Sequence, residues 1–512
     1  TIHTIFKGEI YNYPTLKRML EARGHAFYTR SDTEVIVHAY EEYGEQCLEY
    51  FRGMFGLALW DSRTQTLFLA VDRFGIKPLY YAGLKNGMIF GSELKCLLQS
   101  GALERTLDYE ALAQYFTFGY VPAPATIFKS ARKLEPGHCL RWTRGTGMVI
   151  RKYWDLPRDR CERTRSAADL RRELRQVLKG AVQSHLISDV PLGAFLSGGM
   201  DSSSIVALMS EVSDCPVKTF SIGFAERAHN ELDLARQVAE KFHTDHHELI
   251  VEPETIEVLP KLVSHFDEPF ADSSALPTYC VSKLAHEHVK VALSGDGGDE
   301  MFVGYTLFQG LELARHMQVL PTGLRAAMAA LPAMLPRIKS ARWNDRVALW
   351  GKRIMDSALS PREAFRSKVT MIGLSQVGPL LSSELQRSLA EHDPYALLER
   401  HLAQTETAGE ANPLEPFLYT GIKVWLAGQM LTKVDRMSMA NSLEVRVPML
   451  DHCLAEFIAG IPISQRFPHW RLKGLLKDTM ADLLPPAITK HPKQGFTVPL
   501  AAWFRGDIFS YA

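Results

Sequence analysis

The stretch Val190-Pro-Leu-Gly-Ala-Phe-Leu-Ser-Gly-Gly-Met-Asp-Ser-Ser-Ser204 joins an apolar run to a helical pattern through a turn rich in glycine and serine. The run Val190–Leu196 has the length of a buried strand, and apolar residues follow at helical spacing up to Ser210. Glycines in such a turn let the backbone approach an anion, and the unpaired amides of the helix point at it. The pattern predicts a pyrophosphate-binding loop, although a serine-capped turn without a ligand would have a similar sequence. The predicted phosphate contacts are Ser197, Gly198, Gly199, Asp201, Ser202 and Ser203, with Asp201 holding Mg²⁺.

A second glycine-rich loop follows another short apolar run. Lys290–Leu293 reads as a buried strand and leads directly into Ser294-Gly-Asp-Gly-Gly-Asp-Glu300. Loops of this kind meet at the carboxyl edge of a parallel sheet, where α/β folds bind ligands. Asp201 and Asp299 are therefore expected to share a Mg²⁺-bound triphosphate. Neither loop has the Gly-x-x-x-x-Gly-Lys-Ser/Thr pattern, which argues against a kinase or GTPase loop.

Together the two loops resemble the ATP pyrophosphatase domain of the glutamine-hydrolysing asparagine synthetase family. Further motifs extend the resemblance over almost the whole chain. Those of a glutaminase domain are Gly8–Asn12, Ser31–Glu34, Gly53–Asp61, Asp72–Tyr81 and Gly91–Lys95. Those of the synthetase domain are Asp267–Pro269, Asp272–Ser274, Lys433–Ala440, Glu444–Pro448 and Lys493–Phe496.

The expected fold class is α/β, with two domains. Residues 1–152 resemble a glutamine amidotransferase type 2 domain, an incomplete α-β-β-α sandwich of the Ntn-hydrolase type. The polar segment 153–166 is the expected linker. Residues 167–512 are expected to form a doubly wound parallel ATP pyrophosphatase domain with a helical extension. Local patterns predict strands at Phe55–Trp60, Thr66–Val71, Leu79–Ala82, Val217–Phe224 and His246–Val251, and helices at Tyr13–Arg23, Glu34–Tyr43, Leu232–Phe242 and from Ala167 onward.

The resemblance implies roles for further residues of the synthetase half. In this chemistry a carboxylate attacks the α-phosphorus of ATP, pyrophosphate leaves, and ammonia displaces AMP from the acyl adenylate. Asp296 would take the proton that ammonia loses, and Lys493 would neutralise charge on the phosphates. Asp272–Ser274 would shape the acceptor pocket or act only as a helix cap. Val303 stands where the family often has glycine. The adenosine is expected to contact Leu196, Ile222, Ser294 and Gly295.

The glutaminase half departs from the family pattern. In the family an N-terminal cysteine attacks the glutamine amide, whereas this sequence begins with Thr1 and reaches Gly8 too soon for Thr1 to take that place. Lys7 replaces an asparagine of the oxyanion hole. Gly8, Glu9 and Asp32 would still contact glutamine. The chain is thus expected to be truncated at both ends and unable to hydrolyse glutamine by itself.

Composition limits the classes of function. The 512 residues carry 58 basic and 58 acidic side chains, so nothing predicts a nucleic-acid partner. Seven scattered cysteines indicate reduced thiols and a cytoplasmic location, and no apolar stretch is long enough for a membrane span. The expected cofactors and substrates are ATP, Mg²⁺, glutamine or ammonia, and aspartate or another carboxylate. The resemblance implies a homodimer.

Three alternatives remain open at this point. Val190–Leu196 and Lys433–Arg436 resemble the branch linked to exopolysaccharide and exosortase gene clusters, where the acceptor would be a different carboxylate, such as a uronic acid. A cyclase resembling β-lactam synthetases would also tolerate the absent nucleophile, although such an enzyme has no need for Glu9 and Asp32. The third alternative is an inactive truncated product.

Overall fold

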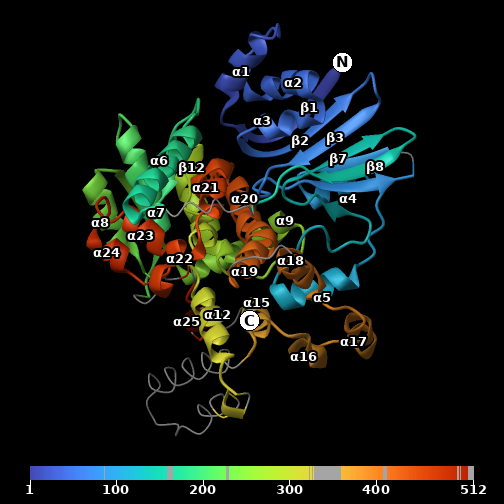
Figure 1. The fold of residues 1–512 in the computed structure, drawn as a ribbon. Coiled ribbons are helices and arrows are strands. Elements are labelled where there is room, and N and C mark those ends of the chain that lie inside the picture. The colour runs from blue at the N-terminus through green and yellow to red at the C-terminus, as the bar shows by residue number, and fades with distance from the viewer. Residues whose placement is uncertain are drawn as a thin grey trace.

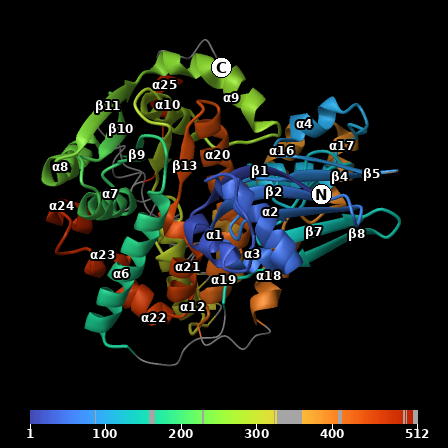
Figure 2. The ribbon, with the colours of Figure 1, turned by 90° about the horizontal axis from the view of Figure 1, so that it is seen from above.

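The computed structural model describes residues 1–85, 87–157, 165–226, 230–321, 323–325, 327, 359–406, 412–492, 495 and 498–505. These residues form an N-terminal unit and a larger C-terminal unit, which lie side by side (Figures 1 and 2). Half of the expected linker, residues 158–164, lies outside the described residues.

The N-terminal unit is built on an antiparallel sheet in the order β1-β2-β3-β7-β8 and a smaller sheet in the order β5-β4-β6. The strands of the first sheet are β1 (Ile2–Ile10), β2 (Gly53–Asp61), β3 (Thr66–Val71), β7 (His138–Thr143) and β8 (Gly147–Lys152). The strands of the second are β4 (Tyr80–Leu84), β5 (Gly87–Gly91) and β6 (Arg132–Lys133). The helices are α1 (Tyr13–Glu21), α2 (Asp32–Tyr43), α3 (Cys47–Tyr50), α4 (Leu94–Gln99) and α5 (Tyr109–Phe118), with a 3-10 turn η1 (Gly44–Gln46). The predicted strands and helices are confirmed, whereas sequence analysis did not predict β1, which pairs with β2 over its full length from Ile2 opposite Asp61 to Ile10 opposite Gly53.

Three apolar clusters define the layers of this unit. Leu16, Leu20, Val35 and Ile36 from α1 and α2 pack on the first sheet, while α4 and α5 cover the second. Between the sheets, side chains of β2 and β3 pack against Leu79 and Tyr81. The layers are therefore α-β-β-α, as the sequence predicted.

The C-terminal unit contains a parallel sheet in the order β11-β10-β9-β12-β13. Its strands are β9 (Leu192–Phe195), β10 (Lys218–Phe224), β11 (Asp245–Val251), β12 (Val291–Leu293) and β13 (Glu444–Arg446). The chain adds strands on one side of β9 and then on the other, so the point where strand order reverses lies between β9 and β12. That is where ligands bind in open α/β sheets, and both glycine-rich loops begin there.

Helices cover both faces of this sheet, as a doubly wound fold requires. One face packs against α6 (Ala167–His185), α7 (Met200–Val212) and α8 (Leu232–Phe242). The opposite face packs against α10 (Ala275–His286) and α20 (Thr432–Met439). Successive residues of β12 point to opposite faces: Leu293 packs on the side of α6, α7 and α8, and Ala292 packs on the side of α10 and α20. The predicted helices at Ala167 and Leu232–Phe242 are confirmed.

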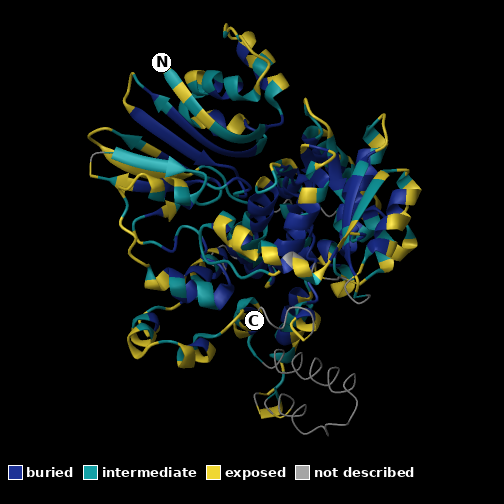
Figure 3. Cartoon of the chain, turned by 180° about the vertical axis from the view of Figure 1, so that it is seen from behind, coloured by how far each residue is buried: buried dark blue, intermediate teal, exposed yellow. Residues whose placement is uncertain are grey.

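The remaining elements form the helical extension and its connections. They are η3 (Pro253–Val258), α9 (Leu259–Phe266), α11 (Gly298–Met301), α12 (Thr306–Met317), α15 (Pro361–Val369), α16 (Leu374–Val377), η4 (Gly378–Leu380), α17 (Ser383–Ala390), α18 (Ala396–Glu406), α19 (Glu415–Thr420), the π-helix η5 (Gly421–Leu431), η6 (Pro448–Leu450), α21 (His452–Ala459), α22 (Ile463–Arg466), η7 (Pro468–Trp470), α23 (Gly474–Thr479), α24 (Pro486–Lys490) and α25 (Leu500–Trp503). Buried residues run through the centre of both units, and exposed residues concentrate on outer helices and loops (Figure 3). In the part of the chain that the structure describes, no helix combines the length and apolar character needed to cross a membrane.

A buried ion triad joins the two units. The Asp435 carboxylate on α20 contacts Lys7 Nζ of β1 at 2.7 Å and Lys77 Nζ at 2.9 Å. The side chains of Asp435 and Lys77 are only 2% and 3% exposed. Burial alone would raise the pKa of Asp435, but Lys77 and Lys7 outweigh it and hold the pKa well below its usual range. Asp435 is therefore an ionised anchor between the units.

Candidate active site

The first loop connects β9 to α7 in a conformation that requires glycine. Gly198 has a φ of +77°, and a Cβ at this position would lie 2.8 Å from the Ala235 amide nitrogen of α8. The loop is closed by hydroxyls: Ser197 Oγ accepts a hydrogen bond from the Gly199 amide at 3.2 Å, and Ser202 Oγ accepts one from the Ser197 amide at 3.2 Å. The loop thus ends at the amino terminus of α7, where helix amides favour an anion.

The second loop packs against the first, backbone to backbone. A Cβ at Gly295 would lie 2.7 Å from the Ser202 amide nitrogen, and one at Gly298 would lie 2.5 Å from Asp201 Oδ1. Only glycines allow this approach. The predicted meeting of the two loops at the sheet edge is therefore observed.

One lysine connects the acidic residues of the two loops. Lys473, which directly precedes α23, contacts Asp201 Oδ2 and lies 2.6 Å from Asp299 Oδ1. Its side chain is 6% exposed. Burial would lower the pKa of Lys473, but the two carboxylates outweigh it and raise the pKa well above its usual range. Asp201 and Asp299 are thus close enough for a single cation to contact both.

The loops form one wall of a cavity of about 610 Å³. Most of the residues predicted to bind ATP line it, and Gly198 and Ser203 lie behind the wall instead. Ser203 is fully buried in the first turn of α7. The predicted residues that line the cavity are Leu196, Ser197, Gly199, Asp201, Ser202, Ile222, Ser294, Gly295, Asp296 and Asp299.

Another wall of the cavity carries a lysine beside a carboxylate. Lys433 Nζ, on α20, lies 2.8 Å from Ser274 Oγ and 3.4 Å from Asp272 Oδ2, and Gln429 Nε2 donates to the same Asp272 oxygen at 3.3 Å. The other Asp272 oxygen accepts a hydrogen bond from the Ser274 amide at 2.9 Å. Asp272 therefore holds the amide of Ser274, the N-cap residue of α10, and is also part of the cavity wall, while its role at an acceptor stays a prediction.

Two acidic side chains of the second loop differ in their surroundings. Asp296 is half-buried, lines the cavity and accepts a hydrogen bond from Ser294 Oγ. Glu300 also lines the cavity, is buried, and accepts a hydrogen bond from Tyr305 Oη at 2.7 Å. Burial and, next, the neighbouring Asp299 charge raise the pKa of Glu300 to about 7. Both carboxyls are therefore part of the cavity wall.

The residues predicted to bind glutamine lie in the N-terminal unit, near the contact between the units. Gly8 has a φ of +145° in β1, and a Cβ there would lie 2.0 Å from the Met54 carbonyl oxygen. Asp32 Oδ2 accepts a hydrogen bond from the Ile10 amide at 3.0 Å. Glu9 Oε2 pairs with Arg446 Nη2 of β13 at 3.1 Å, and burial raises the pKa of Glu9 to about 7. Lys7 points toward Asp435 rather than toward these three residues.

Two further predictions concern single residues. Lys493 lies outside the described residues, so its predicted role stays a prediction. Val303 is buried and has a φ of +55°, so it adopts the left-handed conformation that favours glycine although it carries a β-branched side chain.

Comparison with known families agrees with this geometry. The family model described as asparagine synthase matches residues 173–512, and the glutamine amidotransferase domain model matches residues 1–154. The chain belongs to the asparagine synthase family. Asparagine synthetase (glutamine-hydrolyzing) 1 of Bacillus subtilis is 33% identical, and the match covers 99% of this chain and 77% of that protein.

More distant relatives of this asparagine synthase family protein match over the same span. Asparagine synthetase (glutamine-hydrolyzing) 3 of Bacillus subtilis is 30% identical, covering 99% of this chain and 78% of its own length. Amidase chry2 of Gibberella zeae is 26% identical, and the match covers 99% of this chain and 78% of that protein. Both matches thus span the two units of this chain.

Sequence analysis missed several residues of this asparagine synthase cavity. Lys473 belongs to no motif in the sequence, and only the fold brings it to Asp201 and Asp299, which are distant in the chain. Lys433 and Glu300 stood within recognised motifs, but nothing in the sequence indicated their burial or partners.

Proposed function

We propose that this protein is a glutamine-dependent asparagine synthetase, which adenylates the side-chain carboxylate of aspartate and transfers ammonia to it. The observation that carries the proposal is the meeting of two glycine-rich loops around one lysine, in a cavity that also contains Lys433. An ATP pyrophosphate would lie on the first loop and the α7 amides, and the acceptor would lie toward Lys433.

The proposed reaction has two steps, adenylation and ammonia transfer. A carboxylate oxygen of aspartate bonds to the α-phosphorus of ATP, and the bond to the β-phosphate oxygen breaks, releasing pyrophosphate. Ammonia then adds to the acyl carbon, AMP leaves, and one proton is lost from nitrogen. Asp296 is the proposed proton acceptor, and Lys473 neutralises charge that develops on the departing pyrophosphate.

The residues present also fit Mg²⁺. Asp201 and Asp299 supply carboxylate oxygens, the donor type that Mg²⁺ prefers, and both contact one ammonium already. When bound, Mg²⁺ would neutralise phosphate charge and orient the triphosphate. Lys473 holds the two carboxylates close together.

The acceptor is proposed from the polar wall around Lys433. A free α-carboxylate would pair with the Lys433 ammonium, and an α-ammonium group would pair with Asp272, which Lys433 and hydrogen bonds keep ionised. Asp272 has a pKa below its usual range because Lys433 and the Ser274 hydrogen bonds outweigh burial. Aspartate carries both groups, whereas a uronic acid lacks the ammonium.

The test is the exchange of labelled pyrophosphate into ATP by the full chain, with aspartate, glutamate or a uronic acid. Exchange should require aspartate, and ammonia should convert it to equal amounts of AMP and asparagine. Lys433→Met should raise the KM for aspartate with little change in the KM for ATP. Exchange with a uronic acid but not with aspartate would overturn the acceptor, and no exchange with any carboxylate would overturn adenylation.

A further inference from the structure

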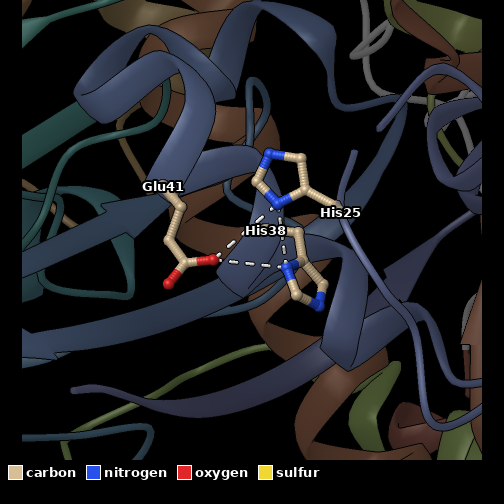
Figure 4. A group of neighbouring side chains, drawn as sticks. All are labelled: His25, His38 and Glu41. Carbon is tan, nitrogen blue, oxygen red and sulfur yellow. Dashed lines mark hydrogen bonds and ion pairs between the residues drawn. The ribbon is translucent and has the colours of Figure 1, made fainter. Parts of the chain in front are cut away.

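Three potential metal ligands converge in the N-terminal unit, away from the cavity. His38 and Glu41 stand one turn apart on α2, and His25 lies in the segment between α1 and α2 (Figure 4). His25 Nδ1 and His38 Nδ1 are 3.2 Å apart, His38 Nδ1 lies 3.2 Å from Glu41 Oε2, and His25 Nδ1 lies 3.8 Å from the same oxygen. The histidine side chains are each 16% exposed and Glu41 is 41% exposed. One coordination position thus remains accessible from solvent.

The contacts of the two Nε2 atoms influence whether the Nδ1 atoms of His25 and His38 carry a proton or a lone pair. His25 Nε2 lies 3.2 Å from Glu42 Oε2, and His38 Nε2 faces Glu34 Oε1 at 3.7 Å. A carboxylate at Nε2 favours the proton on that nitrogen. In that tautomer the two Nδ1 atoms and the Glu41 oxygen, which lie within 3.8 Å of one another, can all direct lone pairs at one cation.

The charges around the cluster also favour a cation. Glu34, Glu41 and Glu42 surround the two rings. Two cations lie near them: Arg23 pairs with Glu42 at 2.6 Å, and Lys17 donates to the Thr29 carbonyl at 2.8 Å. Hydrogen bonds from Thr29 Oγ1 and from the Tyr28 and Thr29 amides hold the Glu34 carboxylate in place beside His38. The cluster therefore has excess negative charge even when both rings are neutral.

The three ligand atoms are 3.2, 3.2 and 3.8 Å apart, which is close to the spacing in one type of coordination. Zinc binds histidine nitrogen and carboxylate oxygen at about 2.0–2.2 Å in a tetrahedron, whose ligand atoms are about 3.3–3.6 Å apart. Mg²⁺ and Ca²⁺ prefer six or more oxygens, which the cluster does not offer. We propose that His25, His38 and Glu41 bind one Zn²⁺ ion, with water as the fourth ligand. Glu42 and Glu34 orient the two rings, as outer carboxylates do at zinc sites.

The described residues contain one other group of possible ligands, and its atoms are already used. In Asp451-His452-Cys453 the Asp451 carboxylate pairs with Arg52 at 2.6 Å and accepts a hydrogen bond from the Cys453 amide at 3.0 Å. This group is therefore a helix cap and a contact between the units, and it serves as the internal control.

The proposed Zn²⁺ would fasten the segment between α1 and α2. That segment leads to Asp32, which begins α2 and accepts the Ile10 hydrogen bond. Zinc binding should therefore raise the thermal unfolding midpoint of the full chain, because a ligand that binds only the folded state stabilises it.

The experiment uses the untagged full chain after removal of metals with a chelator. Calorimetric titration with Zn²⁺ should give one site per chain, and Co²⁺ should give the strong visible absorption of four-coordinate cobalt. His38→Gln and Glu41→Gln should abolish or weaken binding, and Glu42→Gln should weaken it by about 10–100-fold. Glu41 is partly exposed, so this variant should fold as the wild type does in the absence of metal.

Three controls separate the proposed site from other sources of binding. His452→Gln, Cys453→Ser and Asp201→Asn should each retain the zinc site. Absence of zinc binding, equal binding by the His38 and Glu41 variants, or loss of binding only in one of the controls would each overturn the proposal.

Discussion

Two buried ion triads in this molecule have opposite charge arrangements. In the cavity, the Lys473 ammonium lies between the carboxylates of Asp201 and Asp299. At the contact between the units, the Asp435 carboxylate lies between the ammonium groups of Lys7 and Lys77. The first triad has a net negative charge, and its two carboxylates line a cavity of about 610 Å³. The second has a net positive charge and is enclosed by protein at Asp435 and Lys77, which are 2% and 3% exposed, while Lys7 is 25% exposed.

The difference shows that access, rather than local geometry, separates a reactive ion cluster from a structural one. Excess charge that faces a cavity can be neutralised by a bound ligand or ion of opposite charge. Charges enclosed by protein are neutralised only by each other, so loss of the Asp435 carboxylate would leave Lys77 buried without its partner.

The largest expected effect is on stability, at the enclosed triad. Asp435→Asn removes the central charge and leaves Lys7 and Lys77 facing each other, which should cost about 3–5 kcal/mol of unfolding free energy. Urea denaturation at pH 7 measures this loss. Asp245→Asn breaks an exposed pair with Lys218 and should cost at most about 1 kcal/mol. Equal losses in the two variants would contradict the distinction between the enclosed triad and an ordinary ion pair.

The next effect is on chemistry, at the open triad. Lys473→Met removes the charge that would stabilise the departing pyrophosphate, and the rate of pyrophosphate exchange should fall by about 10²–10³-fold. Exchange at saturating ATP and aspartate measures it. Lys490→Met, an exposed lysine on α24, should leave the rate unchanged. If the Lys473 variant exchanges pyrophosphate as fast as the wild type, Lys473 is a structural counter-ion, as Asp435 is.

The difference between the triads also explains what the sequence could and could not predict. Asp201 and Asp299 stand in glycine-rich loops after apolar strands, so local pattern predicted both their chemistry and their meeting at one sheet edge. Lys473 and Lys7 have no such local signal. Lys473 approaches the loops only because α23 packs beside them, and Lys7 pairs with a residue more than four hundred positions away.

The fold followed the same rule. Strands with strong apolar patterns, such as Thr66–Val71, were predicted at their observed bounds, because burial on both faces leaves a clear signal. β1 was missed because most of its residues are only half-buried and it contains Lys7, Gly8 and Glu9 in succession, so it has no continuous apolar run. Single strands were thus predicted where their own residues carry a strong apolar pattern.

The smallest of the three effects concerns a buried carboxyl without an ammonium partner. Glu300 has a pKa near 7 in the folded protein, against about 4.5 in the unfolded chain, because burial and then Asp299 oppose its ionisation. Between these values the folded state binds more protons, so stability should fall as pH rises from about 4.5 to 7, by about 3 kcal/mol from this group. Glu300→Gln keeps an acceptor for Tyr305 and should remove that component of the pH dependence, making the variant more stable than the wild type at pH 8.

Urea denaturation at pH 5 and pH 8 measures this difference in stability, with the exposed Glu391→Gln variant as the control. An unchanged pH dependence in Glu300→Gln would show that Glu300 is ionised in the folded state, and that a cation stabilises it as Lys7 and Lys77 stabilise Asp435.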